Sequence, residues 1–328
     1  MNKSKVVHAV VAKSFYNGSE VLAEMLIYRH PPKTIKVEKD VEYGKNNRER
    51  MNLLYQKDRT KKQPLMVYIH GGGWISGGID MRNTYCAEYA KQGFFVANID
   101  YEYAPKQVFP YQIQQCLTAI DKIYSLADKY NFDTSKILLA GESAGGYFIT
   151  YLAALAADHT LYKKIGLKFD HIDDFKVEAL VSICGAFDIK RLATSKFPDM
   201  QFMIESFSNI PRNEIANPLN ADRVKLLSPV ITEGFPPTMI IYATHDELRF
   251  ESYALQEQLI NLGISYSTFK CTGIIALHAW AIATCISKGR ECLDKTLDFI
   301  LPYFDLTKTP LTKEKSNDKK PNVEEATN

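Results

Sequence analysis

Short apolar runs alternate with helix-length segments through most of this 328-residue chain. The runs that we expect to form strands are residues 65–69, 94–99, 137–140, 179–183, 238–243 and 266–269, with helices at 82–91, 112–129 and 144–157 between the early ones. Strands that are apolar on both faces and separated by helices are typical of a parallel sheet covered on two sides. Before them, alternating residues between Ile35 and Asp58 predict an antiparallel pair at one edge.

Three segments depart from this alternation. Residues 187–235 put about fifty residues between two strands, which is too long for a plain connection and predicts a helical cap. Residues 1–34 have apolar residues at helical spacing, so we expect a helical segment that joins this cap. Residues 307–328 are mostly polar and charged and are expected to be disordered. The α/β core is therefore expected at residues 35–186 and 236–306.

One expected strand ends in Gly141-Glu142-Ser143-Ala144-Gly145. A Gly-x-Ser-x-Gly segment at the end of a strand is the nucleophile-elbow pattern. The turn is so tight that only residues with almost no side chain fit beside the serine, whose Oγ is pushed out above the sheet. Ser143 is therefore the candidate nucleophile.

The strand at residues 65–69 is followed by His70-Gly71-Gly72-Gly73-Trp74. Glycines leave their backbone N–H groups open to a ligand, which is what the binding of an oxyanion requires. Gly72 and Gly73 would supply two donors and Ala144 a third, whereas His70 is expected to anchor the loop rather than to act as a base. A phosphate loop is disfavoured because no Gly-Lys-Ser/Thr ends the run.

A nucleophilic serine needs a base and an orienting acid, which follow it in the order serine, acid, histidine in α/β-hydrolases. The four histidines after Ser143 are His159, His171, His245 and His278, and His278 alone follows the last expected strand. It is therefore the candidate base. The acid should lie just after residues 238–243, where Asp246 precedes Glu247. Asp246 is preferred for its shorter side chain.

Two alternatives remain open at this point. Asp188, which follows the preceding strand, is the reserve acid. Trp74 either forms a wall of the pocket or packs in the core. Bulky side chains in the expected cap, Phe197, Phe202 and Phe207, favour a small apolar pocket, and we take Trp74, Phe202 and Phe207 as candidate substrate-binding residues.

Composition excludes several classes of partner. With 40 basic and 38 acidic residues the formal net charge is +2, so nothing attracts nucleic acid or an acidic membrane surface. No apolar stretch approaches the ~18 residues of a membrane span, and Val6–Ala12 is too short and polar for a signal peptide. We expect a cytoplasmic protein with a small-molecule partner, and a homodimer is left open.

The six cysteines form no Cys-x-x-Cys pair and no zinc-type spacing with histidine. We therefore expect six reduced thiols, no metal and no cofactor. Cys184 lies in an apolar run and is expected to be a small buried hydrophobe.

Together these segments resemble an α/β-hydrolase esterase of the hormone-sensitive lipase type, which includes bacterial acetyl and short-chain carboxylesterases. The matching segments are His70-Gly71-Gly72-Gly73-Trp74, Tyr101-Glu102-Tyr103-Ala104-Pro105, Phe109-Pro110, Asp133-Thr134-Ser135-Lys136-Ile137, Gly141-Glu142-Ser143-Ala144-Gly145-Gly146 and Pro236-Pro237 with Asp246-Glu247-Leu248. The resemblance covers about residues 62–300. It implies an eight-stranded, mostly parallel sheet with helices on both faces and a helical cap.

Several residues depart from the pattern of that group. Glu142 replaces the usual Asp before the serine, Glu102-Tyr103 replaces Arg-Leu, and Ala243 replaces a glycine. None of these changes removes a catalytic group. The expected activity is hydrolysis of small or short-acyl esters through an acyl-enzyme. Kynurenine formamidase-like hydrolases share both glycine motifs, so an amide substrate is the alternative, and a non-catalytic small-molecule receptor on the same fold is another.

Overall fold

The computed structural model describes residues 30–58, 60–273 and 276–311. Its centre is a sheet of eight strands in the order β1-β2-β4-β3-β5-β6-β7-β8. The strands are β1 (Ile35–Glu42), β2 (Arg50–Gln56), β3 (Gln63–Ile69), β4 (Phe95–Ile99), β5 (Phe132–Glu142), β6 (Val177–Ile183), β7 (Thr238–Ala243) and β8 (Tyr266–Cys271). Only the β1–β2 and β2–β4 pairings are antiparallel. The predicted parallel sheet with an antiparallel edge pair is confirmed.

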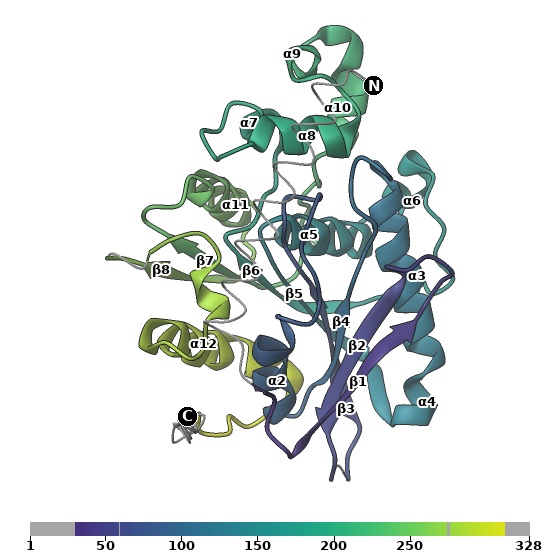
Figure 1. Cartoon of the computed structure of the whole chain (residues 1–328), viewed down its shortest axis with the longest axis vertical. Coiled ribbons are helices and arrows are strands. Elements are labelled where there is room, and N and C mark those ends of the chain that lie inside the picture. The colour runs from purple at the N-terminus through teal and green to yellow at the C-terminus, as the bar shows by residue number, and fades with distance from the viewer. Residues whose placement is uncertain (1–29, 59, 274–275, 312–328) are drawn as a thin grey trace, which may run out of the picture.

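Helices cover both faces of the sheet (Figure 1). One apolar core includes side chains of α3 (Tyr111–Ser125), α5 (Ala144–Ala157) and α11 (Arg249–Asn261). The other core includes those of α2 (Asn83–Lys91) and α12 (Ser287–Ile300). Because β3 to β7 are pressed between two cores, their side chains must be apolar on both faces, which is the pattern visible in the sequence.

The sequence analysis did not predict the two long helices near the C-terminus, α11 and α12. In α11 only Glu251, Ser252, Leu255 and Leu259 are buried, and two of these four side chains are polar. The predicted helix at 112–129 is interrupted at Leu126, between α3 and α4 (Ala127–Tyr130). The remaining short elements near the core are α6 (Thr160–Ile165), the 3-10 turn η2 (Trp280–Ile282) and the 3-10 turn η3 (Leu301–Phe304).

Residues 187–235 contain the short helices that lie over the carboxyl ends of the strands (Figure 1). These helices are α7 (Ile189–Leu192), α8 (Met200–Ser208), α9 (Arg212–Ile215) and α10 (Ala221–Leu226), with the 3-10 turn η1 (Pro218–Asn220) before α10. Buried residues of α8 and α10 belong to the same apolar core as α5. We call residues 187–235 the cap.

The two expected terminal segments lie mostly outside the described residues. Residues 30–34 form a turn that leads into β1, whereas 1–29 of the expected N-terminal helical segment are not described. Of the tail, only 307–311 are described. There Gln92 donates to the carbonyl of Thr309 at 3.1 Å and accepts from its N–H at 2.7 Å. This pair of hydrogen bonds orders the start of the segment that the sequence predicts to be disordered.

The cap begins at a buried carboxylate of α11. Glu251 accepts hydrogen bonds from the backbone N–H groups of Phe187 at 3.0 Å and Asp188 at 2.7 Å, and it lies 3.4 Å from the guanidinium of Arg191. Burial raises the pKa of Glu251 to about 7, against the lowering effect of the two N–H groups and Arg191. The carboxyl therefore binds a proton more tightly in the folded chain than in the unfolded one.

We expect stability to fall as pH rises from the ordinary value of 4.5 towards about 7, because in that window the folded chain retains a proton that the unfolded chain has released. Glu251→Gln should flatten this dependence. Urea unfolding at about pH 5 and about pH 8 measures it, with Glu257→Gln on the exposed side of the same helix as control. Equal pH slopes in wild type and Glu251→Gln would contradict the assignment.

Candidate active site

Ser143 lies between the end of β5 and the first turn of α5. Its backbone has φ +55° and ψ −118°, a positive φ that residues with a side chain rarely adopt. The turn is possible because its neighbours are glycines: a Cβ atom at Gly141 would lie 2.7 Å, and one at Gly145 2.0 Å, from the carbonyl oxygen of Ile69. The N–H of Ser143 donates to Ile183 on β6 at 2.9 Å, which fixes the turn to the sheet.

The structure brings the candidate base and acid together. His278 Nδ1 lies 2.8 Å from Asp246 Oδ2, and the other carboxylate oxygen accepts the N–H of Leu248 at 2.9 Å. The Asp246 side chain is fully buried, whereas a quarter of the His278 side chain is exposed. The Phe197 ring of the cap packs edge-on against the imidazole, with the centroids 4.9 Å apart.

The carboxylate of Asp246 is stabilised in its ionised form. Burial by itself would raise its pKa, but the charge of His278 and hydrogen bonds from His278, Leu248 N–H and Cys184 outweigh burial and lower the pKa. An ionised acid at Nδ1 holds the imidazole in the tautomer whose other nitrogen can accept a proton.

The two alternative acids make other contacts. Asp188 caps α7 through a hydrogen bond from the N–H of Lys190 at 2.9 Å, and it lies 3.4 Å from Arg191. Glu247 is partly exposed and lies 3.6 Å from Arg249. Neither geometry orients His278, so the structure favours the arrangement in which Asp246 is the acid.

The glycine loop is held by a buried ion pair below it. Glu142 Oε1 accepts the N–H of Gly71 at 2.7 Å and Arg82 Nε at 2.8 Å, and Oε2 accepts the hydroxyl of Tyr68 at 2.5 Å. Gly72 and Gly73 have φ of +120° and +59°, which glycine adopts without strain. The Glu142 carboxylate thus fixes the start of the segment that carries the candidate oxyanion donors.

His70 anchors the loop from the other side. Its ring stacks on Tyr101, with centroids 4.5 Å apart, and its Nε2 lies 3.2 Å from the buried Asp100. Asp100 also pairs with Arg48 at 3.1 Å. The geometry agrees with an anchoring residue rather than a base.

Ser143, His278 and the glycine loop meet in one cavity of about 260 Å³, which we call the catalytic cavity. The cap side is formed by Phe197, Met200 and Met203. Its remaining lining residues are Gly71, Gly72, Gly73, Trp74, Met81, Arg82, Glu142, Ala144, Ala186, Leu248, Ala279, Trp280 and Ile282. Trp74 combines both predicted roles, since it lines the cavity and stacks on Phe207 with centroids 4.8 Å apart.

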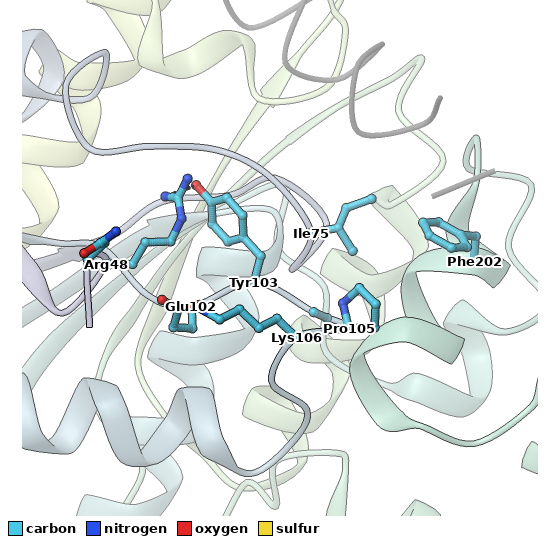
Figure 2. Close-up of a pocket in the computed structure, with 9 residues that line it drawn as sticks. Arg48, Ile75, Glu102, Tyr103, Pro105, Lys106 and Phe202 are labelled. Atoms are coloured by element: carbon cyan, nitrogen blue, oxygen red, sulfur yellow. Dashed lines mark hydrogen bonds and ion pairs between the residues drawn. The ribbon is translucent and has the colours of Figure 1, made fainter. Parts of the chain in front are cut away.

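Two candidate substrate-binding residues lie elsewhere. Phe207 is fully buried in the core beneath Trp74. Phe202 lines a second cavity of about 330 Å³ with Ile75, Tyr103, Pro105 and Lys106 (Figure 2). The residues of α8 that face the catalytic cavity are Met200 and Met203, three positions apart. Apolar residues are frequent along α8, so composition alone did not show which of them face the substrate.

One set of side chains in the described residues could hold a metal ion. Cys184, Asp246 and His278 each offer one ligand atom, and these atoms lie within 4.8 Å of one another. Sulfur, oxygen and nitrogen donors suit Zn²⁺. In this arrangement, however, His278 Nδ1 and Asp246 Oδ2 are joined to each other by the 2.8 Å hydrogen bond.

Comparisons with known proteins agree with the fold and with an ester-hydrolysing enzyme. A family model described as BD-FAE matches residues 51–259. An α/β hydrolase of Acanthamoeba polyphaga mimivirus is 27% identical over 68% of the chain, and the match spans 63% of that protein's own length. An esterase of Gibberella moniliformis (strain M3125 / FGSC 7600) is 27% identical, with 84% of each chain covered. Carboxylesterase NlhH of Mycobacterium tuberculosis (strain ATCC 25618 / H37Rv) is 28% identical over 62% of each chain.

Solved structures share the architecture. The crystal structure of esterase B from Lactobacillus rhamnosis (HN001) superimposes with a TM-score of 0.76 at 20% identity, covering 92% of this chain and 94% of that one. A bacterial heroin esterase gives 0.70 at 20% identity, covering 89% and 90%. The α/β-hydrolase fold expected from the resemblance is thereby confirmed. Within the described residues, every helix is too short or too polar to cross a membrane.

The Arg82–Glu142 pair yields a prediction about stability. Arg82→Met leaves the buried Glu142 carboxylate without its counter-ion, so unfolding should become easier by about 3–5 kcal/mol. The double variant Arg82→Met/Glu142→Gln removes both charges and should recover part of that loss. Urea unfolding of the two single variants and the double variant measures the coupling, and additive effects would contradict a direct pair.

Proposed function

Because the chain belongs to the BD-FAE family, we propose that it is a serine carboxylic-ester hydrolase that cleaves small or short-acyl esters through an acyl-enzyme. The observation that carries the proposal is the meeting of Ser143, His278 and the glycine loop in one cavity, with Asp246 behind the histidine. Relatives named esterase and carboxylesterase support hydrolysis of ester bonds.

In the proposed mechanism Ser143 Oγ attacks the ester carbonyl while His278 Nε2 takes its proton. Asp246 stabilises the imidazolium through the hydrogen bond at Nδ1. The carbonyl oxygen becomes an oxyanion that receives hydrogen bonds from the N–H groups of Gly72, Gly73 and Ala144. When the tetrahedral intermediate collapses, the alcohol leaves with the proton from His278. Water then repeats the sequence on the acyl-enzyme and releases the acid.

The size and lining of the catalytic cavity support a short acyl group. Its volume of about 260 Å³ is just below the range of about 300–1,000 Å³ that is typical of small-molecule sites. Phe197, Met200 and Met203 make the cap side of the cavity apolar, which suits an uncharged acyl chain.

The state of the cysteines supports a cytoplasmic setting. All six cysteines are free thiols and five are buried, as suits a cytoplasmic protein. We also propose that the protein forms a homodimer. Light scattering after size-exclusion chromatography measures the mass in solution and tests this.

Ser143→Ala should lose p-nitrophenyl acetate hydrolysis by at least about 10⁴-fold, because the other groups cannot replace the nucleophile. His278→Ala should lose a similar factor. Ser125→Ala, at an exposed position at the end of α3, is the matched control and should keep wild-type activity. Full activity in Ser143→Ala would overturn the mechanism.

The same variants distinguish an esterase from the two alternatives, a non-catalytic receptor and an amidase. A fluorophosphonate probe should label wild type and Ser125→Ala but not Ser143→Ala. A non-catalytic receptor would leave all three unlabelled. Comparison of p-nitrophenyl acetate with p-nitroacetanilide then distinguishes an esterase from an amidase, and a preference for the anilide would contradict the ester assignment.

Neighbouring residues of α8 test the acyl cavity. Met200→Ala should shift the preferred p-nitrophenyl ester towards longer acyl chains, with a gain of about fourfold in relative kcat/KM for each methylene that enters the new space. Phe202→Ala, which opens only the second cavity, should leave the acyl preference unchanged. A shift in Phe202→Ala but not in Met200→Ala would contradict the placement of the acyl group.

A further inference from the structure

Cys184 lies directly after β6, in the loop beside the acid and the base, and is completely buried. The sequence predicts a small buried hydrophobe at this position, and burial is what the structure shows. Its thiol, however, is not surrounded by apolar atoms alone: Sγ lies within 4.8 Å of a carboxylate oxygen of Asp246 and of a ring nitrogen of His278, and its polar partners are the Asp246 side chain and the backbone N–H of Ala279. Because its neighbours are polar, the thiol does more than fill apolar space.

The backbone of Cys184 is strained in a way that glycine would relieve, yet the chain has a residue with a side chain at this position. Its φ is +48°, a conformation that costs a residue other than glycine about 1–3 kcal/mol. Glycine would avoid this strain, and the chain does use glycine at the next position, Gly185. The N–H of Cys184 is held by Ile241 on β7 at 2.7 Å, so the strained residue is fixed between two strands.

The two thiol contacts join two loops. Asp246 follows β7, and Ala279 is the residue after His278 on the loop that follows β8. The S–H can donate to the carboxylate while sulfur accepts the N–H of Ala279. Burial and the charge of Asp246 raise the pKa of the Cys184 thiol, which keeps the proton on sulfur and therefore keeps the donor in place.

We propose that Cys184 is a positioning residue, which ties the loop of Asp246 to the loop of His278 and thereby holds the carboxylate where it orients the imidazole. The inference rests on the proposed function. Cys184 is not among the residues that line the catalytic cavity, so its effect passes through Asp246 and His278. The cost of losing it should appear in kcat rather than in KM, because the substrate contacts are unchanged.

Cys184→Ala removes both thiol contacts and should lower kcat by about tenfold to a hundredfold with little change in KM. Cys184→Ser restores a donor and an acceptor and should recover most of kcat. Cys116→Ala removes an equally buried thiol from α3 and should leave kcat unchanged. Wild-type kcat in Cys184→Ala, or equal loss in the Ala and Ser variants, would overturn the proposal.

A spectroscopic test needs no active variant and covers the case in which Cys184→Ala does not fold. The infrared S–H band that disappears in Cys184→Ser belongs to Cys184. It should lie at lower wavenumber than the bands of the other buried thiols and move in Asp246→Asn, because a carboxylate is the stronger acceptor. A band at the position of a free thiol would overturn the proposal. Failure of the ester-hydrolase function would instead appear as full activity in Ser143→Ala.

Discussion

The first turn of α5 lies against the end of β3 so closely that a side chain at Gly145 has no space beside the carbonyl oxygen of Ile69. This contact puts the serine turn and the glycine loop side by side, although 71 positions separate Glu142 from Gly71. It is the reason that the Glu142 carboxylate can reach the Gly71 N–H, and that Arg82 and Tyr68 can neutralise and hold that carboxylate. The candidate nucleophile and the candidate oxyanion donors are therefore fixed by one rigid junction.

Backbone strain collects around this junction. Of the nine residues other than glycine with positive φ in the described part of the chain, Trp74, Ser143, Cys184 and Ala279 lie in or beside the catalytic cavity. Ser143 and Cys184 directly follow the ends of β5 and β6, where neighbouring strands can impose the conformation, whereas Trp74 and Ala279 lie in the loops after β3 and β8. The rest of the sheet, with both faces buried, supplies the stability that offsets this cost.

The strands and the three chemical groups of the site were predictable because each depends on local pattern. Apolar runs mark β3 to β7, and the order of residues after Ser143 leaves His278 and Asp246 as the natural partners. The cap residues were not predictable in the same way. Which residues of α8 face the cavity depends on how the cap sits on the sheet, so Met200 and Met203 were missed while Phe202 and Phe207 were chosen for their size. The polar role of Cys184 was hidden for a similar reason, since its partners come from two loops far along the chain.

The helix α8 also separates the catalytic cavity from the second cavity. Phe202 faces the second cavity while Met200 and Met203 face the catalytic one, so consecutive residues of one turn belong to different compartments. Each residue of an α-helix advances the side-chain direction by about 100°. Insertion or deletion of a single residue before α8 would therefore exchange which side chains line the catalytic cavity, without any change in Ser143, Asp246 or His278. The lining of the catalytic cavity can thus change through chain length in the cap alone, while the residues at the ends of the strands stay as they are.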